Sequence, residues 1–263
     1  FYNAEQKKQV QPYQSKRAIS SIQATDDLHR LNECDLIVEA VFEDISLKEK
    51  VIERSEEFIN GKAVFASNTS TIPITRLSKK SRDPEKFIGI HFFSPVNKMQ
   101  LVEIIKGEKT SSETLAKAFD YVLQLNKIPI VVNDKRGFYT SRVFERYVKE
   151  GFSLLMEGVN PQNIEFAGMQ AGFPVGPLSV ADEIGISLLN SIRIQEKVHL
   201  ETEGKQYLKG PWDDVIDIMI KKLNRTGRAS RSGFYDYPKD SKKKLWPGLM
   251  NHFPLSTASI TQN

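Results

Sequence analysis

Residues 35–67 read DLIVEAVFEDISLKEKVIERSEEFINGKAVFAS, and this stretch decides the fold of the 263-residue chain. The apolar run at 35–40 has the length of a buried strand, and residues 63–67 form a second such run. Residues 47–59 lie between them and show helical spacing, with these side chains on one face: Leu47, Val51, Ile52, Phe58 and Ile59. A strand, a helix and a second strand in this order predict neighbouring parallel strands with a helical crossover.

The same alternation extends over the first half of the chain. Further strands are predicted at 18–24, 87–91 and 127–132, and helices at 28–33 and 115–125. Strands that alternate with helices indicate an α/β fold, in which a mostly parallel sheet carries helices on both faces.

The character of the sequence changes after residue 133. Residues 134–137 (DKRG) predict a turn, and strand-like runs then nearly vanish. We expect an all-α domain over residues 134–250, with helices at 138–157, 161–171, 180–194 and 212–223 and a loop at 233–238. Residues 251–263 are expected to form a poorly ordered tail.

Composition narrows the functional class. The chain is 40% hydrophobic and 27% charged, as globular proteins are, and its net charge of +4 suits polyanionic small molecules. The basic residues are scattered, which argues against nucleic-acid binding, and no apolar run has the length of a membrane span. The single cysteine, Cys34, excludes an internal disulfide and favours a reducing compartment. No metal site is assigned.

Residues 88–106 (IGIHFFSPVNKMQLVEIIK) carry the first candidate site. His91 closes one apolar run, and Glu103 lies inside the next. A charged residue among strand-forming residues is costly to bury unless it is paired, so we expect these two side chains to meet. An imidazole held by a carboxylate is a general base that works near neutral pH. The alternative is a structural histidine next to an edge-strand glutamate.

Polar residues follow two other predicted strands. Glu43 and Lys48 come just after the strand at 35–40, where an acid can accept from ribose hydroxyls and a lysine can approach a phosphate. The alternative is a helix-terminal acid and an exposed lysine. Residues 68–71 (NTST) follow the strand at 63–67, and they offer more hydroxyl and amide groups than one helix cap requires.

Two further features concern the cofactor and the second domain. The chain contains no G-x-G-x-x-G, the loop that seats a dinucleotide pyrophosphate at a helix N-terminus. Residues 171–177 (AGFPVGP) are punctuated by glycine and proline and are followed by Asp182, which can cap a helix or orient a group near the interdomain cleft.

Six ordered motifs resemble the L-3-hydroxyacyl-CoA dehydrogenases of fatty-acid β-oxidation, above all the dehydrogenase region of the bacterial multifunctional α subunits. They are DLIVEAVFED, FASNTSTIPIT, GIHFFSPVNKMQLVEII, DKRGFYTSR, AGFPVGPLSVADEIG and SGFYDYP, and they cover about residues 34–247. The resemblance implies an incomplete Rossmann-type, doubly wound parallel sheet over residues 1–133, without its glycine-rich loop. It also implies a helical dehydrogenase domain over 134–250. The chain does not begin with Met, and we expect it to be truncated within the nucleotide domain and to bind NAD+ weakly.

The resemblance also assigns roles to individual residues. It implies that His91 is the base, Glu103 its orienting partner and Ser70 a contact to the 3-oxygen of the substrate. Glu43, Lys48, Asn68 and Ser70 are implied on the NAD side, and Ser70, Ser94 and Ser141 on the substrate side. The chain departs from the family at Ser141, where many members have Asn, at Ala229, where they have Lys, and at Arg231, where they have Gly.

The sequence therefore predicts a fragment of a larger hydratase/dehydrogenase that oxidises L-3-hydroxyacyl-CoA to 3-ketoacyl-CoA with NAD. The expected partners are an acyl-CoA thioester, a second copy of the chain, and a multienzyme complex with a thiolase subunit. The expected location is the cytoplasm of a bacterium, or a mitochondrion or peroxisome in a eukaryote. One alternative is a catalytically silent scaffold, and another is a two-domain NAD(P) dehydrogenase of a small hydroxy acid.

Overall fold

The structure is a computed structural model that describes residues 6, 10–202 and 204–256. It divides into two compact units, Phe1–Tyr139 and Thr140–Asn263. The change of character predicted after residue 133 falls in the segment that links the last strand of the first unit to the first helix of the second.

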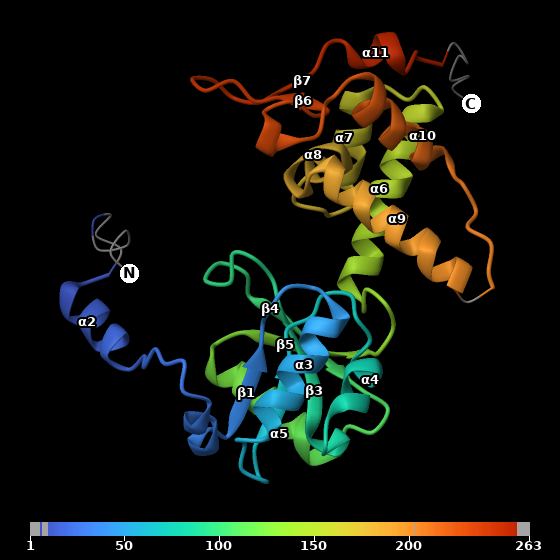
Figure 1. Cartoon of the computed structure of the whole chain (residues 1–263). Helices are drawn as coiled ribbons and strands as arrows, with labels where there is room; N and C mark the ends of the chain where they lie inside the picture. The colour runs from blue at the N-terminus through green and yellow to red at the C-terminus, as the bar shows by residue number, and fades with distance from the viewer. Residues whose placement is uncertain (1–5, 7–9, 203, 257–263) are drawn as a thin grey trace. The chain divides into compact units, whose positions relative to one another are not determined.

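The first unit is built on a five-stranded sheet (Figure 1). Its strands lie in chain order and are β1 (Leu36–Glu39), β2 (Val64–Ser67), β3 (Phe87–Phe92), β4 (Leu101–Lys106) and β5 (Ile128–Asn133). Strands β1, β2 and β3 are parallel, β4 runs antiparallel to β3, and β5 is parallel to β4. The predicted, mostly parallel sheet is therefore confirmed.

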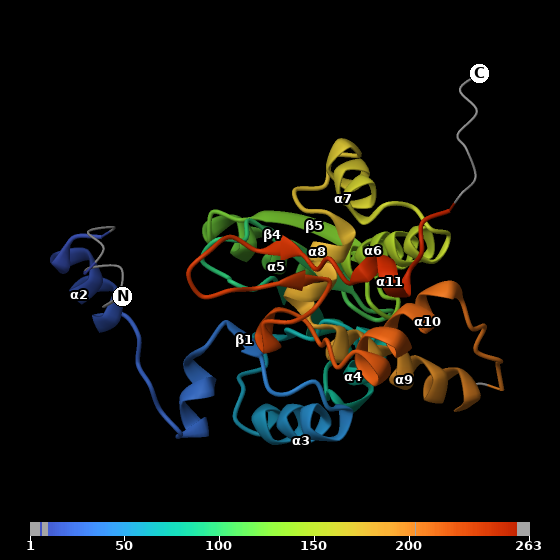
Figure 2. The ribbon, with the colours of Figure 1, turned by 90° about the horizontal axis from the view of Figure 1, so that it is seen from above.

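Helices cover both faces of this sheet (Figure 1 and Figure 2). They are α3 (Ile45–Glu56), α4 (Ile74–Leu77) and α5 (Ser112–Gln124), with short 3₁₀ turns at Ser78–Lys80 and Pro84–Lys86. Because side chains alternate along a strand, Phe65 of β2 packs in the cluster that contains Ile52 of α3, whereas Ala66 packs with Val122 of α5. The sheet therefore carries two apolar clusters, one on each face.

Short polar side chains start the two long helices of this unit. Asp44 accepts a hydrogen bond from the backbone N–H of Leu47 at 2.8 Å, and Ser111 accepts one from Thr114 at 3.1 Å. These N-caps satisfy backbone donors that have no partner within the helix. The cap at Asp44 makes α3 begin directly after β1, which brings the first turn of that helix next to the strand end.

The N-terminal part of the first unit differs from the prediction. The strand expected at 18–24 is absent from the structure: residues 18–20 end helix α2 (Pro12–Ser20), and residues 22–27 form no regular element. Residues 18–24 were predicted as a strand, but the side chains of Ile19 and Ile22 are 55% and 65% exposed. A lone strand without a pairing partner leaves its backbone groups unsatisfied. The helix expected at 28–33 is present as a 3₁₀ helix, Leu28–Glu33.

The second unit is helical, as predicted. Its helices are α6 (Thr140–Met156), α7 (Pro161–Gln170), α8 (Pro177–Ile184), α9 (Ile186–Thr202) and α10 (Pro211–Asp217), with a π-helical continuation at Ile218–Lys222. They enclose one apolar core, in which Phe152 of α6 lies against Phe234 with ring centroids 5.1 Å apart. Among the described residues, no helix combines the length and apolar composition that crossing a membrane requires.

Three details of the second unit correct the sequence prediction. The helix expected at 180–194 is two helices, because Gly185 between them has a φ of 93°, which helical backbone cannot adopt. The loop expected at 233–238 contains a strand, and β6 (Tyr235–Asp236) pairs with β7 (Lys244–Leu245). Finally, α11 (Leu249–His252) and Phe253, which is 2% exposed, join the core, so the expected tail begins later. Residues 257–263 of that tail lie outside the described residues.

Candidate active site

His91 and Glu103 form a buried pair on adjacent strands. The antiparallel register of β3 and β4 places the two residues directly opposite each other, so their side chains share one face of the sheet. Nδ1 of His91 lies 2.8 Å from Oε2 of Glu103, and the two side chains are 9% and 0% exposed. The predicted contact between these two residues is therefore present.

A tight turn fixes the second oxygen of Glu103. The backbone N–H of Tyr139 donates to Oε1 at 3.1 Å. This N–H follows two left-handed residues, Gly137 with a φ of 72° and Phe138 with a φ of 45°. A buried non-glycine residue in this region stores strain, and such strain gathers at sites where a side chain must be placed accurately. The Phe138 ring is 1% exposed and lies 6.1 Å from the imidazole, so the turn packs against the pair as well.

This geometry leaves one imidazole nitrogen for chemistry. A carboxylate only accepts hydrogen bonds, so Nδ1 of His91 carries the proton that lies between the two residues. In the neutral ring Nε2 then holds a lone pair, and it makes no hydrogen bond to any of the described residues. A histidine with a purely structural role is expected to use both nitrogens. The arrangement suits a general base whose protonated form Glu103 stabilises.

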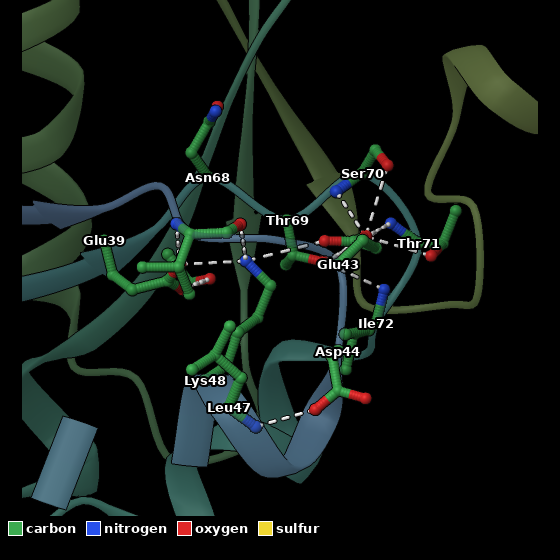
Figure 3. Close-up of polar contacts among 12 residues, drawn as sticks. Glu39, Glu43, Asp44, Leu47, Lys48, Asn68, Thr69, Ser70, Thr71 and Ile72 are labelled. Atoms are coloured by element: carbon green, nitrogen blue, oxygen red, sulfur yellow. Dashed lines mark hydrogen bonds and ion pairs between the residues drawn. The ribbon is translucent and has the colours of Figure 1, made fainter. Parts of the chain in front are cut away.

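A second polar cluster ties the carboxyl ends of β1 and β2 together (Figure 3). Glu39 is the last residue of β1, and its carboxylate accepts from the Ser67 hydroxyl at 2.6 Å and from Nζ of Lys48 at 2.9 Å. The side chains of Glu39 and Lys48 are each 1% exposed. Sequence reasoning missed Glu39, although the signal was available: it is an acid at the end of an apolar run, as Glu103 is an acid within one.

Lys48 differs from both sequence interpretations. It is not an exposed lysine, and its ammonium is already engaged: besides Glu39 it contacts the Val41 carbonyl at 3.2 Å and Oε2 of Glu43 at 3.5 Å. An ammonium has three N–H donors, which these three acceptors match. A direct contact of Lys48 with a cofactor phosphate would require the loss of one of them.

Glu43 binds the polar turn that follows β2 (Figure 3). Its Oε1 accepts from the backbone N–H groups of Ser70 and Thr71, both at 2.9 Å, and from the Thr69 hydroxyl at 2.7 Å. Burial alone would raise the pKa of Glu43, but the hydrogen bonds from Thr69 and Thr71 and the charge of Lys48 hold this pKa below its ordinary value. Glu43 is therefore a carboxylate that organises the 69–72 turn, rather than a helix-terminal acid.

The structure brings the predicted residues of the first unit to one edge of the sheet. Glu43, Ser70 and His91 follow or close β1, β2 and β3, and these parallel strands end at the same edge. Asn68 links two of the strand ends, since its Oδ1 accepts from the backbone N–H of Phe92 at 2.9 Å. Ser94 lies further on, in the exposed connection between β3 and β4.

The second unit carries the three positions at which the chain departs from the family pattern. Ser141 is part-buried near the start of α6. Ala229 is exposed in a 3₁₀ turn, and Arg228 beside it pairs with Glu183 at 2.5 Å. Arg231 follows with a φ of 58°, a left-handed conformation that favours glycine.

Asp182 has a structural role within this unit. Its two oxygens accept from the backbone N–H groups of Phe234 and Tyr235, each at 2.8 Å, and Oδ2 also accepts from the Tyr237 hydroxyl at 3.1 Å. A Cβ added at Gly233 would lie 2.0 Å from Oδ1, so only glycine fits there. Asp182 thus anchors residues 233–237 to α8. The backbone N–H groups that it binds belong to this segment and not to the start of a helix.

Comparison with known proteins identifies the family. Residues 1–135 match the sequence profile of the 3-hydroxyacyl-CoA dehydrogenase NAD binding domain, and residues 137–237 match that of the 3-hydroxyacyl-CoA dehydrogenase C-terminal domain. The chain belongs to the 3-hydroxyacyl-CoA dehydrogenase family. NAD is accordingly the cofactor of the domain type to which the first unit belongs.

Individual relatives agree with this family. The fatty acid oxidation complex subunit alpha of Shewanella loihica is 39% identical over 221 residues, which make up 84% of this chain and 30% of that protein. The chain thus spans about a third of the length of the curated relatives that it matches. Among solved structures, (S)-3-hydroxybutyryl-CoA dehydrogenase from Ralstonia eutropha is similar with a TM-score of 0.78 and 29% identity, over 90% of this chain and 82% of that one. The 3-hydroxybutyryl-CoA dehydrogenase of Escherichia coli K12 has a TM-score of 0.79 and 26% identity, over 92% of this chain and 50% of that one.

Proposed function

We propose that this chain provides the dehydrogenase chemistry that converts an L-3-hydroxyacyl-CoA to the 3-ketoacyl-CoA. The observation that carries the proposal is the His91–Glu103 pair. Its 2.8 Å contact orients a buried imidazole and leaves Nε2 available as a base. The names of the similar solved structures, which are 3-hydroxybutyryl-CoA dehydrogenases, support the substrate class.

The residues at the strand ends fit the ribose and nicotinamide end of a dinucleotide. Ligands of doubly wound sheets bind outside the carboxyl ends of the strands, where Glu43, Asn68 and Ser70 lie. The side chain of Glu43 is 36% exposed, so its carboxylate can accept from ribose hydroxyls. Lys48 acts on the same ribose side through Glu43, which it contacts at 3.5 Å. We assign no residue to the pyrophosphate, because the sequence contains no G-x-G-x-x-G.

The proposed mechanism divides the work among three side chains. Bound NAD+ supplies an acceptor for the hydride that leaves C3 of the substrate. Nε2 of His91 takes the proton of the 3-hydroxyl as the C–O bond becomes a carbonyl, and Glu103 stabilises the imidazolium that forms. The Ser70 hydroxyl, which donates to Glu43 at 3.2 Å without substrate, is proposed to turn and donate to the 3-oxygen when the substrate binds. Ser94 and Ser141 are proposed as further substrate contacts.

The proposal includes the setting of the chain. Its relatives are named as subunits of fatty acid oxidation complexes, which supports a role as the dehydrogenase region of a larger assembly. A second copy of the chain and a thiolase subunit are the partners that we propose, and the cytoplasm is the proposed location.

A substitution of the base tests the function. His91→Ala should lower kcat for the oxidation of a 3-hydroxyacyl-CoA by roughly 10²–10⁴-fold with little change in KM, because it removes proton transfer and leaves binding intact. His29→Ala is the matched control, since His29 packs on Phe58, with ring centroids 4.8 Å apart, and lies away from the strand ends. Steady-state assays of NADH formation measure both variants. An unchanged kcat in His91→Ala would remove this residue from the mechanism.

A further inference from the structure

Glu39 is a buried carboxylate at the end of β1, with its side chain 1% exposed, and no role in the proposed reaction has yet been given to it. Besides Ser67 and Lys48, it accepts from the backbone N–H of Val41 at 2.6 Å. It thereby fixes the chain as it leaves β1, the end of β2 and the first turn of α3. A buried acid that meets three donors from three different segments is costly to disturb, since its loss leaves these donors without an acceptor.

The contacts of Glu39 continue through Lys48 to the 69–72 turn. Lys48 lies between two carboxylates, with Nζ 2.9 Å from Oε1 of Glu39 and 3.5 Å from Oε2 of Glu43 (Figure 3). The other oxygen of Glu43 accepts from Ser70, both from its backbone N–H at 2.9 Å and from its hydroxyl at 3.2 Å. One uninterrupted chain of polar contacts therefore joins a buried residue of β1 to the hydroxyl next to the proposed reaction centre.

The charges along this chain explain why Glu39 is needed. Lys48 is 1% exposed, and a buried ammonium is stable only if a charge of opposite sign and enough acceptors surround it. The Glu43 side chain is 36% exposed and its carboxylate is more distant from Lys48, so Glu39 supplies most of that compensation. Because Glu39 belongs to the sheet and binds Lys48, the sheet sets the position of the Lys48 ammonium. Glu43 therefore pairs with an ammonium whose position is fixed.

We propose that Glu39 is a positioning residue of this site: it anchors Lys48, which holds Glu43 across the 69–72 turn and so sets the orientation of Ser70. The inference rests on the proposed function only for the role of Ser70 toward the substrate. It predicts that a change at Glu39 or Lys48 is felt at Glu43 and at Ser70, whereas a buried ion pair that served stability alone would affect only unfolding.

The test follows the carboxyl titration of Glu43 by NMR in the 263-residue chain, without substrate or cofactor. Lys48→Met removes a neighbouring positive charge and should raise the pKa of Glu43. Glu39→Gln removes a negative charge and leaves Lys48 to Glu43 alone, so it should lower the same pKa. General loosening of the fold would not move one pKa in opposite directions in the two variants.

Hydrogen exchange provides the second measurement. In Lys48→Met, the amides of Ser70 and Thr71 should exchange about tenfold faster or more, because their acceptor Glu43 has lost its anchor. Glu53→Gln is the matched control: Glu53 lies on the same helix and pairs with Lys80 at 3.1 Å, but both side chains are about half exposed. This control should change neither the exchange nor the titration of Glu43.

A double variant keeps the test decisive if Lys48→Met fails to fold. Glu39→Gln/Lys48→Met removes both buried charges together, which is far less costly than leaving one of them unpaired. In this variant the pKa of Glu43 should rise, as in the single lysine variant. The proposal is overturned if every folded variant keeps the parent values, both for the pKa of Glu43 and for the exchange rates of the Ser70 and Thr71 amides. Because no measurement involves turnover, these outcomes are independent of the kinetic result for His91.

Discussion

The two units each contain a carboxylate that is completely buried, and the two carboxylates serve different purposes. Glu103 in the first unit and Asp182 in the second are both 0% exposed. Glu103 faces an imidazole, which can bind and release a proton within the physiological range. Asp182 faces two backbone N–H groups and a tyrosine hydroxyl, none of which ionises near neutral pH. The partner, and not the burial, therefore distinguishes a candidate catalytic acid from a structural one.

The same contrast explains the surroundings of each residue. Glu103 is held by a strained turn that leaves one face of His91 for chemistry. Asp182 is enclosed by the segment that it holds, and even a Cβ at Gly233 would collide with it. A buried carboxylate at an active site must leave its neighbour able to contact the substrate. A structural carboxylate stabilises the fold more as each hydrogen-bond donor around it is held in place.

The largest expected effect follows from neutralising the acid of the first unit. Glu103→Gln should lower kcat by about 10²-fold, within the range for general acid–base catalysis, because the imidazolium loses its stabilising charge. Asp182→Asn is the control and should leave kcat per folded molecule unchanged. Equal losses of kcat in both variants would mean that burial alone explains the effect.

A smaller effect concerns the pH dependence of stability. Burial raises the pKa of Asp182 to about 6, although the backbone N–H groups of Tyr235 and Phe234 oppose this shift. Its ordinary pKa is 3.8, so between about pH 4 and pH 6 the folded protein holds a proton that the unfolded chain releases. The stabilisation that this proton provides is present below about pH 4 and is lost as the pH rises through about 6.

Denaturant unfolding of the parent and of Asp182→Asn measures this dependence. The difference in unfolding free energy between the two proteins should fall by at most about 1.4 kcal/mol per pH unit between pH 4 and 6, and then stay constant. Comparing the two proteins cancels the titration of all other groups. A difference that grows with pH would mean that the surrounding donors lower the pKa of Asp182 more than burial raises it.

The smallest expected effect lies at Arg231, just before the segment that Asp182 anchors. Arg231 has a φ of 58°, in a region that costs a non-glycine residue about 1–2 kcal/mol. Arg231→Gly should therefore raise the unfolding free energy by about 0.5–1 kcal/mol, after the greater freedom of glycine in the unfolded chain is subtracted. Thermal unfolding checks this value. Ala229→Gly in the same turn is the control, and it should lower stability because Ala229 lies in a 3₁₀ helix.

Much of the fold follows from local patterns in the sequence. The errors in the sequence-based prediction also have local causes. The strand at 35–40 and the helix after it were predictable because apolar spacing and the Asp44 cap agree. The strand predicted at 18–24 was wrong, since a short stretch of sequence does not by itself supply a neighbouring strand for pairing. The break at Gly185 lies inside a continuous helical pattern, and only its φ of 93° reveals it.

The candidate site was predictable where two side chains in contact lie close together in the sequence. His91 and Glu103 lie on neighbouring strands, so a short connection nearly determines their meeting. The long-range contacts of Glu39 and Glu43 were not predictable in this way, because Ser67 and the 69–72 turn reach these two carboxylates only through the parallel crossover from β1 to β2. Glu39 was missed for the same reason: its partners lie on three separate segments.

The antiparallel ladder between β3 and β4 keeps the His91–Glu103 pair apart from the exposed connection that joins the two strands. The ladder sets His91 opposite Glu103, and a slip of one residue would turn Glu103 to the other face. The connection between these strands carries Ser94, and its residues 94–100 are exposed. Substitutions of these exposed side chains can therefore accumulate while the hydrogen bond between His91 and Glu103 stays intact. The buried pair of His91 and Glu103 and the exposed connection are thus encoded in different stretches of the chain.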